Sequence, residues 1–290
     1  MNLKIEIRSL DADEDLTMAE DLQRKVWPGS ETEIIPKHLL VALIHNGGMV
    51  LGAFHRERLV GLLTGFLGTY ADRSERNAIK QTSHSLGVDP EYRDANIGFR
   101  MKKMQRAISL KNGIRLVTWT YDPLQSRNAN LNIRRLGAVC NHYYVNYYGE
   151  MRDEINFGYP SDRLKVEWWI RSNRVVERME GQRGALDLAH FIAGGAHNVN
   201  PAALGKDNFP RPSTSDTELE GSVLLLEIPP DISALRKHDD DLALAWRTHT
   251  RALFEEAFSK GYLITDFVYL KGEKIPRSYY VLSHGAGTLG

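Results

Sequence analysis

The chain has 290 residues, with 37 Lys and Arg against 37 Asp and Glu, and 42% of its residues are hydrophobic. This balance lacks the charge bias of nucleic-acid-binding and membrane-surface proteins and favours a small-molecule partner. Cys140 is the single cysteine, which excludes an internal disulfide and any multi-cysteine metal site. Because no leader pattern or membrane-length apolar run is evident, we expect a cytoplasmic protein that binds neither nucleic acid nor membranes.

The hydrophobic pattern of the first 170 residues predicts a mixed sheet covered by helices. In chain order we expect a strand at residues 3–10, helices at 11–26 and 36–45, strands at 49–55, 59–67 and 82–88, a helix whose first turn holds residues 93–98, a strand at 115–120, a helix at 124–136, and strands at 138–145 and 163–170. The predicted fold class is therefore α/β of the α+β type, with a mostly antiparallel central sheet.

The remainder of the chain predicts an extension to this sheet. Residues 171–220 are charged and then rich in Pro, Gly, Asn and Ser, which is typical of a connecting segment with a long loop. Residues 221–290 predict a strand at 221–228, a helix at 239–260 and strands at 262–270 and 279–282. We expect domains at 1–170, 171–220 and 221–290. The three acidic residues at 239–241 predict helix capping, and we expect no metal.

The segment most informative about function follows the strand at residues 82–88. A Pro turn leads there into a helix whose start carries Arg93, Asn96 and Gly98. Amides at a helix start carry a partial positive charge, so a strand, turn and helix with an Arg at the mouth can hold a pyrophosphate.

These residues resemble the signature of the GNAT superfamily of acyl-CoA-dependent N-acyltransferases. Its pattern (Arg or Gln, two residues, Gly, one residue, Gly or Ala) falls on residues 93–98, with Asn96 in place of the first glycine. Asn tolerates unusual backbone angles, so we expect the loop to survive this exchange with altered amide positions. The resemblance covers about residues 3–170 and implies a GNAT fold, in which the strand before the motif splays from its neighbour.

The resemblance implies an acyl-CoA co-substrate, either acetyl-CoA or another such as succinyl-CoA. Its pyrophosphate would lie on the segment Arg93, Asp94, Ala95, Asn96, Ile97, Gly98 and Phe99, and Leu86 and Val88 match positions beside the pantetheine arm. Asn128 matches an Asn that contacts the coenzyme in many members. The alternative for the motif is a surface arginine beside a tight turn.

His84 is the predicted general base, because an ammonium cannot attack a thioester and histidine titrates near working pH. It lies nine positions before Arg93, as does a histidine in the similar arylalkylamine N-acetyltransferases. Because side chains of a strand alternate between its two faces, we expect Thr82, His84, Leu86 and Val88 to share one face. The alternative is a strand histidine with no catalytic task.

The general acid is less defined by the sequence. Family members carry a Tyr four residues before the glycine that ends the second helix, and counting back from Gly137 reaches Ile133 instead. Among the nearby tyrosines Tyr144 is the best candidate, with packing as its alternative role. Cys140 lies in an apolar strand, where we expect a buried thiol with a normal or raised pKa, which argues against an acyl-enzyme and for direct transfer.

Residues 118–139, YYGEM and YPSDRLKVEWW resemble a GNAT subgroup with a long C-terminal extension. Some of its members occur alongside racemases of N-succinyl amino acids, which implies amino-acid N-acylation. Arg163 is then a candidate for the acceptor carboxylate, with a salt bridge to Asp162 as its alternative.

Two function classes follow from the sequence. The first is an N-acyltransferase that acts on a small amine or amino acid in a ternary complex. The second is a catalytically silent acyl-CoA-binding or scaffold protein that kept the GNAT shell, which the departures at Asn96 and Ile133 allow. A homodimer remains open, as does the identity of the acceptor.

Overall fold

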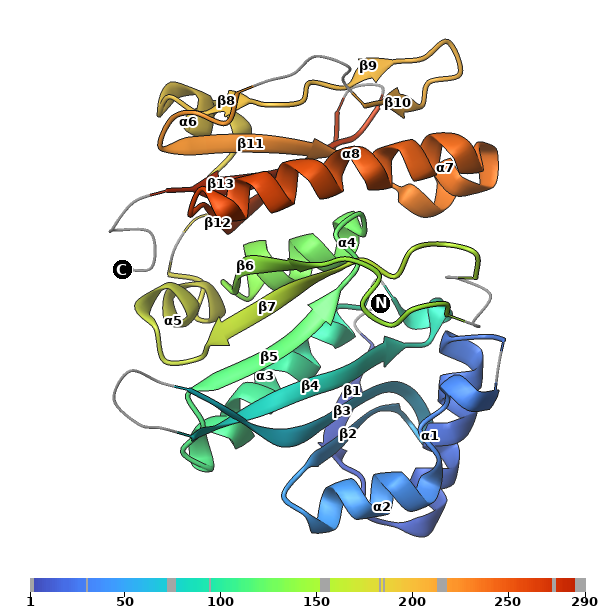
Figure 1. Cartoon of the computed structure of the whole chain (residues 1–290). Helices are drawn as coiled ribbons and strands as arrows, with labels where there is room; N and C mark the ends of the chain where they lie inside the picture. Colours follow the sequence, from blue (N-terminus) through green and yellow to red (C-terminus); the bar gives the residue numbers. More distant parts are fainter. Residues whose placement is uncertain are drawn as a thin grey trace. The chain divides into compact units, whose positions relative to one another are not determined.

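The computed structural model describes residues 3–29, 31–71, 77–93, 95–151, 157–182, 184, 186–212, 218–272 and 275–284. The chain forms two compact units (Figure 1): Met1–Trp119 with Glu150–Tyr159, and Thr120–Gly149 with Pro160–Gly290. These units divide the chain at positions other than 170 and 220, and the three expected domains stay a prediction.

The first unit is built on strands in the order β1-β2-β3-β4-β5. They are β1 (Ile5–Ser9), β2 (Met49–His55), β3 (Arg58–Tyr70), β4 (Ala78–Val88) and β5 (Leu116–Tyr121), the last two residues of β5 being counted in the second unit. Neighbours pair antiparallel except for β4 and β5, which are parallel. This arrangement leaves β4 between an antiparallel and a parallel neighbour.

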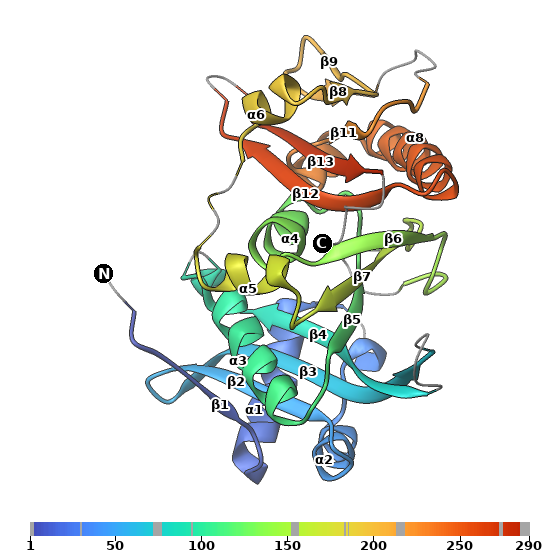
Figure 2. The same ribbon diagram turned by 90° about the vertical axis from the view of Figure 1, so that its left-hand side faces the viewer.

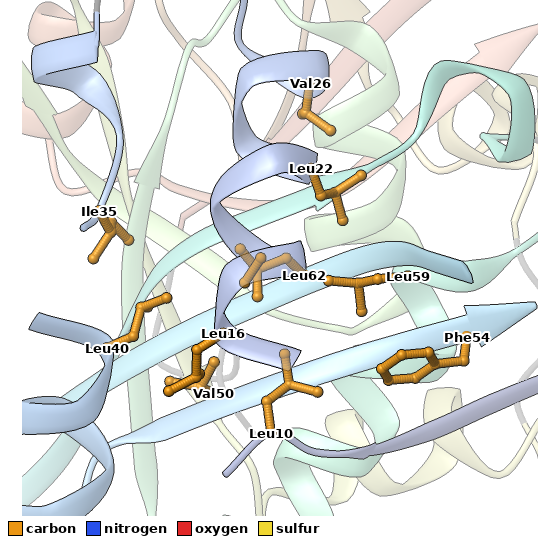
Figure 3. Packing of buried hydrophobic residues seen from close by; sticks show 11 residues of the cluster. Leu10, Leu16, Leu22, Val26, Ile35, Leu40, Val50, Phe54, Leu59 and Leu62 are labelled. Atoms are coloured by element: carbon orange, nitrogen blue, oxygen red, sulfur yellow. The ribbon is translucent and has the colours of Figure 1, made fainter. Parts of the chain in front are cut away.

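Helices α1 (Asp13–Val26) and α2 (Lys37–His45) cover one face of this sheet, with the short helix η1 (Glu31–Glu33) between them in the chain. Apolar residues of α1 recur every three or four positions and are buried, which gives the helix one core-facing stripe. Figure 3 shows the resulting cluster, which comprises Leu10, Leu16, Ala19, Leu22, Val26, Ile35, Leu40, Val50, Phe54, Leu59 and Leu62.

Helix α3 (Ile97–Lys111) covers the opposite face (Figure 2) and follows the one-turn helix η2 (Pro90–Tyr92). Ile97 and Met101 of α3 are fully buried against Val60 and Leu63 of β3. The sheet is therefore packed against a hydrophobic core on each face. The core under α3 holds the amino end of this helix beside β3 and β4.

The second unit carries strands in the order β7-β6-β12-β13-β11-β8, which pair antiparallel except for the parallel pair β11 and β8. They are β6 (Val139–Tyr144), β7 (Arg163–Trp169), β8 (His197–Asn198), β11 (Val223–Ile228), β12 (Leu263–Leu270) and β13 (Arg277–Ser283). Strands β9 (Ala203–Leu204) and β10 (Pro210–Arg211) form a separate small hairpin. The helices are α4 (Ser126–Ala129), the π-helix η3 (Asn130–Arg135), α5 (Asn173–Met179), α6 (Leu188–Ala193), α7 (Ile232–His238) and α8 (Asp240–Ser259).

Helix α8 packs against this sheet through large aromatic side chains. Phe254 stacks on Tyr143 of β6 at 5.8 Å between ring centroids and meets Tyr280 of β13 edge-on at 5.3 Å. The Asp239 side chain accepts a hydrogen bond from the Leu242 amide, so it caps the helix as expected.

The expected mixed α/β class with a mostly antiparallel sheet is confirmed. The single helix expected at 124–136 is wrong in its geometry, because a π-helical segment occupies 130–135. Within 171–220 the structure has short helices and strands where we expected a charged segment and a long loop. Of the described residues, none lies in a helix that combines the length and apolar character needed to cross a bilayer.

Candidate functional site

The turn before the motif is held by a buried carboxylate. Asp89 is 1% exposed, and its side chain accepts hydrogen bonds from the Glu91 amide at 3.1 Å, Lys25 at 2.9 Å and Arg58 at 2.8 Å. Burial by itself would raise the pKa of this carboxyl, but Lys25, the Glu91 amide and the charge of Arg58 outweigh burial, so its pKa lies below the ordinary value. The turn is therefore pinned to α1 and β3.

Asn96 begins α3 in the left-handed conformation, at φ 59° and ψ 21°. Asn enters this region more readily than most residues, so it can take this backbone conformation where the family usually has glycine. The first hydrogen bond of the helix runs from the Arg100 amide to the Asn96 carbonyl at 3.3 Å, so the amides of residues 97–99 precede the helical ladder. Arg93 is exposed just before this end, and Asp94 lies outside the described residues.

β4 and β5 part immediately beside this helix. Over the described lengths of both strands, they pair only at Gln81 with Val117 and at Thr82 with Thr118. We call the point beyond Thr82 and Thr118 the fork. From the fork to Val88, β4 pairs with β3 on its other side. The backbone edge of residues 83–88 that faces away from β3 is therefore not used in a ladder with β5.

The resemblance implied two strands that part and a helix that starts at the motif, and the structure has both, with α3 starting at Ile97. This arrangement matches the GNAT fold that the resemblance implied. The first unit supplies both the motif loop and the fork.

Several solved structures of N-acetyltransferases are similar to part of the chain. The chain is similar to the ribosomal-protein-S18-alanine N-acetyltransferase of Escherichia coli (14% identity over 58% of this chain and 94% of that one, TM-score 0.43) and to Arabidopsis thaliana NAA60 in complex with acetyl-CoA (15%, 57% and 99%, TM-score 0.44). It is also similar to an aminoglycoside acetyltransferase from a soil metagenome (20%, 43% and 82%, TM-score 0.37). Comparison of the sequence with protein-family models and with curated proteins found no match.

His84 is the extra residue of a β-bulge. Thr64 of β3 faces Ser85 and Gly65 faces Ser83, so His84 has no partner of its own in the ladder. Its ring lies 5.9 Å from that of Phe66. The side chain is exposed at the protein surface, yet the atoms crowded around the ring partly desolvate it and lower the pKa of His84.

The bulge overturns the expected sharing of faces along β4. Leu86 and Val88 pack with the core cluster under α3, and Ser83 also faces α3. His84 contacts Phe66, whereas Ser85 bonds Thr64 on the side of the sheet opposite to α3. One inserted residue shifts the alternation, so His84 does not share a face with Leu86 and Val88. Their expected contacts with the coenzyme stay a prediction.

The other predicted site residues belong to the second unit. Asn128 is exposed on α4, whereas Ile133 is fully buried in η3. Tyr144 packs against His142 at 4.4 Å and against Tyr147 at 4.6 Å between ring centroids. These contacts match the packing role that we set beside its role as an acid.

Arg163 is nearly buried, at 8% exposure, and its guanidinium lies 5.2 Å from the Tyr148 ring. It donates to the backbone carbonyl of Asp162, whose carboxylate instead binds Arg251 and the Tyr143 hydroxyl. The alternative role that we set out for Arg163 was a salt bridge to the Asp162 carboxylate. In the structure that carboxylate pairs with Arg251 instead.

Sequence reasoning missed a buried polar group beneath the fork. Lys102, Gln105 and Ser109 of α3 bond Gln81 and Ser83 of β4. The available signal was the helical spacing of 102, 105 and 109 within an otherwise apolar face. Among the described residues, no three His, Cys, Asp or Glu side chains converge on a place suited to a metal ion.

Proposed function

We propose that the chain is an acyl-CoA-dependent N-acyltransferase that transfers an acetyl or succinyl group to the amine of a small molecule. The observation that carries this proposal is the bulge that presents His84 two residues beyond the last paired residue of β4 at the fork. A thioester needs free backbone groups for its carbonyl, and an amine needs a base nearby. β4 offers both within a few residues.

The reaction is a direct transfer in a ternary complex. The neutral amine attacks the thioester carbonyl carbon, so a C–N bond forms, the C–S bond breaks and coenzyme A leaves as a thiolate. His84 takes the proton that the amine loses, directly or through a water molecule. Its lowered pKa keeps the imidazole neutral near pH 7, which is the form that a base requires.

The coenzyme would lie along the Arg93–Phe99 segment and the open edge of β4. The amides of residues 97–99 precede the helical ladder, and amides at a helix start are suited to bind an anion such as a pyrophosphate. Arg93 adds a cation beside them, and Asn128 is the candidate contact from α4. Tyr144 is the candidate proton donor to the thiolate.

An amino-acid acceptor is the finer form of the proposal. Arg163 is the candidate for its carboxylate, because a planar guanidinium pairs with a carboxylate through two parallel hydrogen bonds. Arg163→Met should then raise KM for amino acids while leaving KM for the corresponding decarboxylated amines unchanged.

The test is thiol release from acetyl-CoA and succinyl-CoA across D- and L-amino acids and simple amines. His84→Ala should lower kcat about 100-fold and leave the acyl-CoA Kd, measured by calorimetry, unchanged. His45→Ala, an exposed histidine at the end of α2, is the matched control. Acyl-CoA binding without thiol release from any acceptor would support the silent binding protein instead.

A further inference from the structure

Lys102 is a buried amine that contacts both strands at the fork. Its side chain is 2% exposed, and Nζ donates to Ser83 Oγ at 2.9 Å and to Gln105 Oε1 at 3.1 Å. The same atom lies 3.6 Å from the centre of the Trp119 ring. An N–H group above an indole face is attracted by the π-electrons of the ring.

The positions of these partners are specific. Thr82 and Thr118 are the last residues that β4 and β5 pair, and Ser83 and Trp119 are the next residue of each strand. One side chain of α3 thus touches the first residue of each strand after the ladder stops. Lys102 therefore lies where β4 and β5 begin to separate, on the face of the sheet that α3 covers.

Two further side chains of α3 hold the last paired stretch of β4. Gln105 Nε2 donates to Gln81 Oε1 at 3.1 Å, and Ser109 Oγ donates to the same oxygen at 2.8 Å. Gln81, Gln105 and Ser109 are at most 1% exposed. Together with Lys102 they fix the side chains on both sides of Thr82.

A buried lysine at this position costs more folding free energy than an apolar side chain of the same size. Burial disfavours the charged amine and holds the pKa of Lys102 well below its ordinary value. An apolar side chain of equal length would fill the same volume without this cost. A stability cost that serves no packing need is expected at a functional position.

We propose that Lys102 is a positioning residue that sets the opening of the fork and, through Ser83, fixes the bulge that presents His84. The inference rests on the proposed acyltransferase function. Ser83 directly precedes His84 in the chain, so a hydrogen bond that holds Ser83 also limits the course of the bulge. Lys102 itself lies on the α3 face and acts through the strand.

The test compares Lys102→Met with Lys103→Met, which alters the exposed neighbouring lysine of the same helix. Misplacing a catalytic group by about 1 Å costs roughly 100-fold in rate, so Lys102→Met should lower kcat by about 10- to 100-fold. The acyl-CoA Kd should stay within about threefold, because the Arg93–Phe99 segment is untouched. The melting temperature should change little, because relief of the buried amine offsets the loss of the donor to Ser83 and Gln105, and Lys103→Met should match the wild type in every measurement.

Hydrogen exchange supplies a second readout that does not depend on turnover. Lys102→Met should speed amide exchange in peptides that cover residues 82–88 and leave peptides from β2 unchanged. Ser83→Ala removes the acceptor from the strand side and should give the same pattern, which keeps the inference testable if Lys102→Met does not fold.

The outcomes separate the two proposals. Unchanged kcat and unchanged exchange at 82–88 would overturn the role of Lys102 while leaving the enzyme intact. Parallel losses of kcat, acyl-CoA affinity and melting temperature would show a merely structural residue. A wild type without thiol release would overturn the proposed function, and localised exchange changes in Lys102→Met would then still assign Lys102 to the fork.

Discussion

Replacing Arg247 by Met should destabilise the second unit more than any surface ion-pair substitution. Arg247 is 1% exposed, and its guanidinium makes two hydrogen bonds of 2.7 Å to the Asp122 carboxylate, whose side chain is 16% exposed. Without the guanidinium, the Leu124 amide is the one hydrogen-bond donor left to Asp122 among the described residues, and the charge of Arg163 acts on the carboxylate without a hydrogen bond to it. Breaking a buried ion pair by removing one partner costs about 3–5 kcal/mol, because a charge is left uncompensated.

The size of the second unit sets the expected thermal shift. For about 160 residues, each kcal/mol lowers the melting temperature by about 2–4 °C, so Arg247→Met should lose about 6–20 °C. Scanning calorimetry, with urea denaturation as a second probe, measures this loss. Asp122→Asn combined with Arg247→Met should recover part of it, since a neutral amide is cheaper to bury than a carboxylate.

Arg236→Met is the matched control, because its partner Asp240 is 67% exposed and such pairs contribute about 0–1 kcal/mol. A melting temperature of Arg247→Met equal to or above that of the wild type would refute the reasoning. It would mean that the cost of desolvating the two ions exceeds their attraction.

Three further predictions concern the first unit. As pH falls, kcat/KM should decrease with a midpoint below pH 6.5, because desolvation lowers the pKa of His84. The neutral imidazole that acts as the base is present above this pKa and is lost as pH falls through it. Asn96→Gly should keep the acyl-CoA Kd, whereas Asn96→Val should weaken binding and cost about 1–2 kcal/mol in urea denaturation, because the backbone is left-handed at φ 59°. Gly87→Ala should destabilise the unit by about 1–3 kcal/mol, because the added Cβ would lie 2.8 Å from the Trp27 ring and 3.0 Å from Val26.

Each of these has a clear contrary result. A midpoint at or above pH 6.5, or an acidic decrease of kcat/KM that persists in His84→Ala, would show that His84 is not the group that titrates. Equal affinity of Asn96→Gly and Asn96→Val would mean that the left-handed backbone does not shape the anion site. Gly87→Ala combined with Trp27→Phe should regain stability, and failure to do so would place the strain elsewhere.

Elements with a strong period were predictable from the sequence. The strand expected at 49–55 coincides with β2, and the helix expected at 239–260 is α8 with Asp239 as its cap. Their hydrophobic pattern, turns and capping residues all favour the same structure. The short elements between β7 and β11 were not predictable, because tertiary contacts hold them: Asn198 of β8, for example, donates a hydrogen bond to the Glu227 carboxylate.

The sequence predicted which residues belong to the candidate site better than it predicted how their side chains are arranged. The motif at 93–98 identified the start of α3, and the Asn at 96 takes the backbone that we expected of it. The bulge at His84 left no mark in the sequence, since one added residue in a strand of mixed polarity does not disturb any visible alternation. The π-helix at 130–135 likewise changes which residues share a face, so counting back four positions from Gly137 assumes a geometry that this helix does not have.

The burial of Cys140 makes the chain well suited to thiol chemistry as an experimental tool. It is the single cysteine of the chain, it is fully buried, and burial raises the pKa of its thiol well above the ordinary value. A thiol reagent in an assay of released coenzyme A should therefore meet no background signal from the folded protein. The same reagent reports opening of the second unit, because Cys140 becomes reactive only when β6 is exposed. A cysteine introduced at a surface position would accept a single spectroscopic label without prior removal of the native one.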